Sequence, residues 1–125
     1  MNLLLDTHAL IWTFDDNPTL SEAARAAIAD GENTVFVSAV TAWEIAIKRA
    51  IGKLKLKGDY QRGLQRYRFL PLAISTEHAL AVEHLPQHHG DPFDRLLIAQ
   101  ATLEKLTLVT RDKRFEDYSV KIISA

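Results

Sequence analysis

The pattern of apolar and polar positions predicts strands that alternate with helices. Short apolar runs predict buried strands at residues 3–5, 34–38, 106–110 and 120–123. A further segment at 69–74 contains Pro71, which restricts it to an edge strand or an irregular segment. Because strands alternate with helices, the pattern favours an α/β fold with a mostly parallel central sheet of four to five strands.

Capping and turn residues mark the helices between these strands. Residues 19–22 have the spacing of a capping box, which predicts a helix from there to Gly31. The remaining predicted helices cover residues 7–14, 39–51, 59–68 and 76–85, and a last one that Asp91 and Pro92 open runs to about residue 105. Residues 53–58 alternate lysine with leucine and predict a loop or a short extended segment. We find no repeat or linker, so a single domain over residues 1–125 is expected.

Two carboxylates fall on the apolar faces of predicted helices. At about 100° per residue, Glu44 lies inside an apolar stripe, and Asp94 lies between Ile98 and Ala101. The stripe around Glu44 consists of Val40, Trp43, Ile47 and Ile51. We therefore expect both acids to face the core. Burying a lone carboxylate is costly unless an arginine, a proton or a metal ion offsets its charge.

Two more acids follow predicted strands directly. Asp6 comes after the first strand, and Asp112 comes two residues after the strand at 106–110. Sites in parallel sheets form at the carboxyl ends of the strands, so Asp6, Glu44, Asp94 and Asp112 are expected to converge there. Such a cluster of carboxylates needs a cation to ionise together. Oxygen ligands without cysteine or a firm histidine pair favour Mg²⁺ or Mn²⁺ over zinc.

Each acid also has a purely structural explanation. Asp6 is placed to cap the helix that follows it, and Asp112 to form a turn. Asp94 is placed to stabilise a helix dipole, and Glu44 to pair with Arg95 or Arg111. A cation site explains all four acids by one cause, whereas the structural explanation needs four unrelated ones.

The lack of cysteine and the character of the first residues limit the cellular compartment and the site chemistry that we expect. The chain has no cysteine, which excludes disulfides, a thiolate zinc site and a cysteine nucleophile, and is compatible with a reducing cytoplasm. Its first residues have no cationic leader, and their apolar run breaks at Asp6. We therefore expect neither a signal peptide nor a membrane span, and a cytoplasmic protein.

Basic residues are concentrated in one part of the chain, although the net charge is only −1. Between Lys48 and Arg68 there are eight cations and a single acid, Asp59. This asymmetry indicates either an edge that faces a polyanion or a solvated helix face with a lysine-rich turn.

Four blocks of the sequence resemble VapC-type PIN-domain toxins. They are LDTHALIW at 5–12, SAVTAWEI at 38–45, DPFDRLLIAQA at 91–101 and LVTRD at 108–112. The blocks place Asp6, Glu44 and Asp94 at the family's acidic positions, and Asp112 at a further one whose role varies more across the family. His88, His89 and Asp91 go beyond a minimal pattern. We assign them no role, because a histidine in a surface loop is more often solvated than a ligand.

The resemblance implies a three-layer α/β/α PIN domain that acts as the toxin of a toxin–antitoxin pair. The implied activity is that of an endoribonuclease, in which the four acids hold one or two Mg²⁺ or Mn²⁺ ions that activate water against RNA. It also implies a homodimer, and an antitoxin that inserts a segment into the groove of the acids. We expect Thr7 and Thr110 to hydrogen-bond a carboxylate or a water of the metal. The residues expected to follow the RNA backbone are Lys48, Arg49, Lys53, Lys55 and Lys57.

Other functions remain open at this point. A receiver-like phosphoacceptor module needs an aspartate at the end of its central strand and a lysine at the end of a later one. Here the strand at 34–38 ends in Ser38, and no lysine ends the strand at 106–110. A dehalogenase-type phosphatase needs a second aspartate two residues after Asp6, where the chain has His8. A PIN-fold module that binds RNA or protein without activity is the remaining alternative.

Overall fold

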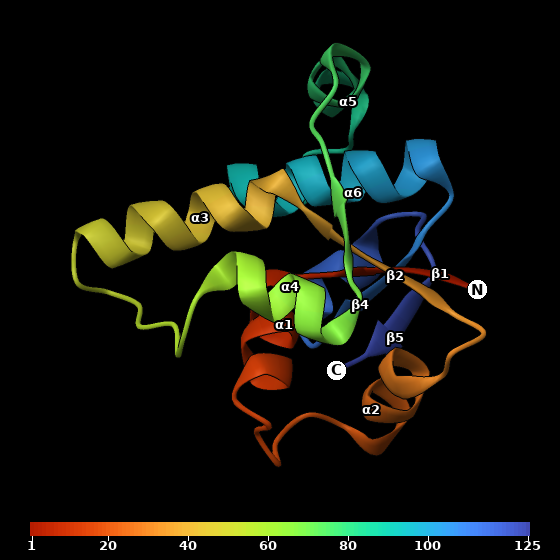
Figure 1. The fold of residues 1–125 in the computed structure, drawn as a ribbon. Coiled ribbons are helices and arrows are strands. Elements are labelled where there is room, and N and C mark those ends of the chain that lie inside the picture. Colours follow the sequence, from red (N-terminus) through yellow and green to blue (C-terminus); the bar gives the residue numbers. More distant parts are fainter.

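A computed structural model describes residues 1–125, and its centre is a five-stranded sheet in which every pairing is parallel (Figure 1). The strand order is β3-β2-β1-β4-β5. The strands are β1 (Asn2–Leu5), β2 (Thr34–Ser38), β3 (Leu70–Leu72), β4 (Thr107–Thr110) and β5 (Ile122–Ser124). The predicted α/β fold with a parallel central sheet is confirmed, and Pro71 lies on an edge strand as expected.

Helices cover both faces of this sheet, which gives three layers (Figure 1). The helices are α1 (Thr7–Phe14), α2 (Glu22–Ala29), α3 (Ala39–Ala50), α4 (Tyr60–Tyr67), α5 (Thr76–Ala81) and α6 (Pro92–Glu104). α1, α2 and α4 pack on one face, α6 and the first turn of α3 pack on the other, and α5 lies against α6. Ile45, further along α3, joins the apolar cluster of the first face. The central strand shows why both faces are covered. Leu3 and Leu5 point into one apolar cluster and Leu4 into the other, so β1 is buried on both sides.

The capping and turn residues predicted most helix ends correctly, but two predicted helices differ from the structure at one end. The helix predicted from residue 19 begins at Glu22, because Ser21 and not Thr19 is its N-cap and accepts from the N–H of Ala24. The capping box predicted at residues 19–22 is therefore wrong. The helix predicted over 76–85 is α5 followed by a 3₁₀ turn at Val82–His84. A second 3₁₀ turn, Lys113–Asp117, follows β4.

The exposed side of α3 corrects the prediction for its apolar stripe. Val40 is buried, but Trp43, Ile47 and Ile51 are 51%, 37% and 60% exposed. The reason is that α3 begins at the carboxyl end of β2 and runs outward from that edge of the sheet, so Ile47 and Ile51 lie beyond the sheet (Figure 1). Trp43 packs edge-on against Phe93 with the rest of its ring in solvent. Glu44 is nevertheless buried, at 6% exposure.

The order in which successive strands join the sheet reverses beside β1. From β1 the chain proceeds to β2 and β3 on one side, and β4 and β5 then fill the other side. The carboxyl ends of β1 and β4 are held together there, where the N–H of Asp6 donates to the carbonyl of Val109 at 3.1 Å. Such a switch point leaves a crevice in which open α/β sheets bind their ligands. No helix is both long enough and apolar enough to cross a membrane.

Candidate metal centre

A cavity of about 240 Å³ opens at the carboxyl ends of β1 and β4. Acids from four separate segments line it: Asp6, Glu44, Asp91, Asp94 and Asp112. The structure thus brings the four predicted acids together and adds Asp91 to them. The other lining residues are Thr7, His8, Trp12, Lys48, Arg111, Arg114 and Phe115.

Asp6 sits at the junction of β1 and α1. It caps α1 by accepting the N–H of Ala9 at 2.8 Å, so the structural role considered for it is also present. The side chain is buried, and this burial raises the pKa of Asp6 above its ordinary value. The nearby Glu44 raises that pKa further, whereas Thr110 and the capping contact lower it. Asp6 is therefore a desolvated carboxylate beside a second one.

Glu44 is held from two sides. The hydroxyl of Thr7 donates to Oε1 at 2.6 Å, as expected for a threonine that contacts a carboxylate. The ammonium of Lys48, one turn further along α3, lies 2.5 Å from Oε2. The arginine partner considered for Glu44 is wrong, because a lysine on its own helix pairs with it. The ammonium group of Lys48 is therefore already paired with an acid of the cavity.

The carboxyl group of Asp94 is also perturbed by its surroundings. It lies in the first turn of α6, which Asp91 caps by accepting from the N–H groups of Phe93 and Asp94. Burial raises the pKa of Asp94 to about 7, and the charges of Asp91, Asp112 and Glu44 add to that rise. The raised pKa of Asp94 therefore indicates that negative charges are crowded in the cavity and poorly solvated.

Asp112 is paired with an arginine that also reaches Asp94. It caps the 3₁₀ turn after β4, and the guanidinium of Arg114 contacts it through Nε at 3.0 Å and Nη2 at 2.5 Å. This contact lowers the pKa of Asp112 below its ordinary value. Nη2 also lies 3.4 Å from Oδ2 of Asp94. Arg114 and Lys48 are therefore the chain's own counter-ions at the cavity.

The donors of the cavity suit a hard divalent cation in their chemistry. They are carboxylate and hydroxyl oxygens, with no thiolate, and such donors favour Mg²⁺ or Mn²⁺. As the side chains stand, no three acidic or imidazole groups are close enough together to chelate an ion. Lys48 and Arg114 already contact oxygens of Glu44, Asp94 and Asp112, so a cation would compete with them for these acids.

The sequence did not reveal that His89 and Arg114 approach the acids of this cavity. His89 was interpreted as a solvated loop residue, but its side chain is only 7% exposed and its Nε2 lies 3.6 Å from Oδ2 of Asp94. His88 is exposed and packs edge-on against Tyr118. Arg114 gave no signal beyond its position two residues after Asp112. The approach of Arg114 to Asp94 and the burial of His89 against Phe115 and Tyr118 depend on how distant segments pack, which no local pattern records.

The predicted RNA-binding cations divide into two groups. Lys48 lines the acidic cavity, whereas the other four are exposed and lie outside its lining. Those four are Arg49, Lys53, Lys55 and Lys57. In the segment after α3, Leu54 and Leu56 pack against the core, so the alternating lysines are left in solvent. This part of the chain forms an irregular loop, as predicted.

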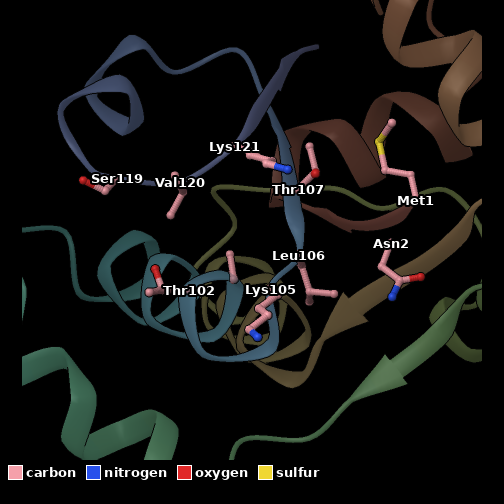
Figure 2. Close-up of a pocket in the computed structure, with 10 residues that line it drawn as sticks. Met1, Asn2, Thr102, Lys105, Leu106, Thr107, Ser119, Val120 and Lys121 are labelled. Atoms are coloured by element: carbon pink, nitrogen blue, oxygen red, sulfur yellow. The ribbon is translucent and has the colours of Figure 1, made fainter.

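The largest cavity lies at the opposite edge of the sheet. It measures about 510 Å³ and is drawn in Figure 2. Asn2 and Thr107 begin β1 and β4 there, and the lining includes Lys105 and Lys121 but no acid or histidine. Because ligand sites in such sheets form at the carboxyl ends of strands, the smaller acidic cavity is the better candidate.

Comparison with known proteins agrees with the fold. The family model described as "PIN domain" matches residues 3–121. A chain in the structure of VapBC2 from Rickettsia felis bound to promoter DNA superposes with a TM-score of 0.72, at 20% identity over 98% of both chains. A toxin–antitoxin complex from Klebsiella pneumoniae gives a TM-score of 0.65, at 23% identity over 98% of this chain and 96% of that chain. DNA-bound VapBC from Salmonella typhimurium gives 0.66, at 19% identity over 98% and 97%. No curated protein matches the sequence.

Proposed function

Since the chain belongs to the PIN-domain family, we propose that it is a metal-dependent endoribonuclease and the toxin of a VapC-type toxin–antitoxin pair. One observation carries this proposal. Five acids from four segments line one cavity at the switch point of the sheet. Such a cluster of carboxylates destabilises a protein that binds no cation, because each negative charge raises the free energy needed to ionise the next carboxyl group.

Asp6, Glu44, Asp94 and Asp112 are the proposed ligands of Mg²⁺ or Mn²⁺. When bound, the cation makes water a better nucleophile and offsets the charge that develops on the phosphodiester. Burial raises the pKa values of Asp6 and Asp94, and neighbouring carboxylates raise them further, so a bound cation would favour the ionised form of both groups.

The chain's other residues orient the acids and the substrate. Thr7 fixes Oε1 of Glu44, so that α1 and α3 hold this carboxylate in one orientation. Lys48 and Arg114 line the cavity beside the acids, where their charges would face the phosphate of an RNA strand once a cation offset the carboxylates. The exposed Lys53, Lys55 and Lys57 extend this positive surface and follow the backbone further away.

The proposed partner is a cognate antitoxin, and the proposed assembly contains two copies of the chain. The structures described as VapBC and as a toxin–antitoxin complex support a protein partner. The exposed Trp43, Ile47 and Ile51 on α3 provide an apolar surface beside Lys48 that an antitoxin segment would cover. The mass of the purified chain in solution, with and without the product of a neighbouring gene, tests both parts.

The direct test of activity is cleavage of single-stranded RNA in Mg²⁺ or Mn²⁺, with EDTA as the metal-free control. Asp6→Asn keeps an N-cap side chain on α1 but removes a charge from the cavity, so cleavage should fall at least about 100-fold with the fold intact. Asp59→Asn is the matched control, because Asp59 caps α4 and does not line the cavity. It should cleave at the wild-type rate.

The opposite results assign the chain to another function. Cleavage that persists in EDTA, or in Asp6→Asn at the wild-type rate, contradicts the proposal. A wild-type chain that binds RNA but never cleaves it is the inactive binding module instead. The family match argues against a receiver-like module.

A further inference from the structure

Behind Asp94 lies a polar network that the proposed function does not use. Arg95, the next residue of α6, is buried, and its guanidinium donates to backbone carbonyls rather than carboxylates. The acceptors are the carbonyls of Val82, Leu85, Pro86 and His89. A buried guanidinium with these partners holds the segment before α6 against the helix. This arrangement fixes the place of the His89 backbone.

The same guanidinium also sets the hydrogen bonds of the His89 ring. Nη1 of Arg95 donates to the hydroxyl of Tyr118 at 3.2 Å. That hydroxyl has one proton of its own, and its other close partner is Nδ1 of His89 at 2.8 Å. Nδ1 is the acceptor that the protein offers to the proton of this hydroxyl, so we expect Tyr118 to donate to Nδ1 and the neutral imidazole to carry its proton on Nε2.

The Nε2–H group faces the metal centre. It lies 3.6 Å from Oδ2 of Asp94, and no hydrogen-bond partner satisfies it although it is buried. Phe115 and Tyr118 pack around the ring, so it does not turn away. A buried donor without a partner costs about 1–3 kcal/mol. A small rotation of the Asp94 carboxylate gives this donor its acceptor.

We propose that His89 is a positioning residue that holds Oδ2 of Asp94 through Nε2–H. Arg114 approaches the same oxygen at 3.4 Å, whereas Oδ1 accepts no hydrogen bond in the protein. His89 therefore occupies Oδ2 and leaves Oδ1 for the cation. Hydrogen bonds of this kind orient metal-binding carboxylates and raise metal affinity by about 10–100-fold. This inference rests on the proposed function only where it takes Asp94 to bind the cation.

The first test is the tautomer of His89 in the metal-free protein. Long-range ¹H–¹⁵N spectra of the histidine rings should show His89 with its proton on Nε2. In Tyr118→Phe, which loses the donor to Nδ1, the ring should become a mixture of tautomers. A wild-type ring protonated on Nδ1 overturns the proposal.

The second test uses substitutions to distinguish the roles of the two ring nitrogens of His89. The amide of His89→Gln reaches the position of Nε2 and keeps a donor for Asp94. His89→Asn reaches only the position of Nδ1. Titration of Mn²⁺ without RNA should show affinity at least about 10-fold weaker in His89→Asn, and within about 3-fold of wild type in His89→Gln. Equal losses or no loss in the two folded variants contradict the positioning role.

The two tests also separate this inference from the proposed function. If the wild-type chain binds no Mn²⁺ and cleaves no RNA, the nuclease proposal fails, and the tautomer of His89 still decides its contact with Asp94. If both substitutions unfold the protein, the wild-type and Tyr118→Phe spectra decide the same point. RNA cleavage with reduced Mn²⁺ affinity only in His89→Asn supports both.

Discussion

The hydroxyl of Thr7 donates a 2.6 Å hydrogen bond to Oε1 of Glu44, and so ties the first residue of α1 to the middle of α3. Both side chains are buried, at 5% and 6% exposure. The contact joins helices on opposite faces of the sheet at its carboxyl edge. It is one of the two contacts that fix a proposed metal ligand, the other being the ion pair with Lys48.

Replacing Thr7 by valine removes this hydrogen bond without changing the shape of the side chain. Thr7→Val should lower the free energy of unfolding by about 1–3 kcal/mol, because a buried carboxylate oxygen loses its donor. RNA cleavage should fall by about 10-fold as Glu44 loses its orientation. Thr7→Ser keeps the hydroxyl and should retain most of the activity. Chemical denaturation and initial rates measure the two effects, and equal rates for valine and serine variants would falsify the orienting role.

The pH dependence of the metal-free protein should reflect Asp94. Its pKa is raised to about 7 in the folded state, whereas an unfolded chain releases this proton near the ordinary value of 3.8. Between these values the folded state binds more protons, so stability falls as the pH rises and the contribution is lost above about pH 7. The loss should amount to roughly 2–4 kcal/mol. Burial of Asp6 acts in the same direction.

Denaturation at several pH values between about 4 and 8 checks this dependence. Asp94→Asn should reduce the slope, leaving the part due to Asp6, and should be the more stable protein at neutral pH. The control is Asp117→Asn, which changes an exposed acid outside the cavity and should leave the slope unchanged. Stability that rises with pH across this range in the wild type is the contrary result.

Removing Arg114 should strengthen metal binding. Its guanidinium competes with a cation for Asp112 and Asp94, which it contacts at 2.5 Å and 3.4 Å. Arg114→Gln should therefore bind Mn²⁺ about 3–10-fold more tightly, since an opposing charge leaves the site. Lys113→Gln removes the same charge from the neighbouring position without an acidic partner and is the control. Weaker binding in Arg114→Gln than in this control would show that Arg114 supports the metal instead.

The lysines after α3 should act on RNA and not on the metal. Lys53, Lys55 and Lys57 are exposed and unpaired, so a triple change to glutamine should weaken RNA binding without altering Mn²⁺ affinity. If all three contact phosphates, the plot of log affinity against log salt should become less steep by about 2. Lys105→Gln with Lys121→Gln, at the opposite edge of the sheet, is a control that removes two charges away from the proposed RNA surface. An unchanged salt slope in the triple variant removes these residues from the RNA surface.

The sequence predicted the elements of this fold because their signals are local. Alternating apolar runs, caps and turns identified the five strands and six helices, with errors at ends such as the start of α2 and the end of α5. The acids at strand ends were also local signals, since a parallel sheet brings Asp6 and Asp112 to one edge whatever the remaining packing.

Helical periodicity was a weaker guide to burial. It placed Glu44 correctly in the interior, but it assigned Trp43, Ile47 and Ile51 to the core. Periodicity gives the face of a helix and not the extent of the sheet below it. The projection of α3 past the sheet therefore appeared only in the structure (Figure 1).

The sequence by itself determined that the chain forms a covered parallel sheet with carboxylates at one edge, because residue type and spacing are sufficient for strands, helices and their ends. The pairing of Lys48 with Glu44 is an i, i+4 contact within α3, so helix spacing could have indicated it. Only the tertiary structure decided that Arg114 reaches Asp94 as well as Asp112, and that His89 is buried against Phe115 and Tyr118. These contacts join segments far apart in the chain, and electrostatic and hydrogen-bond energies depend strongly on the distances that the packing sets.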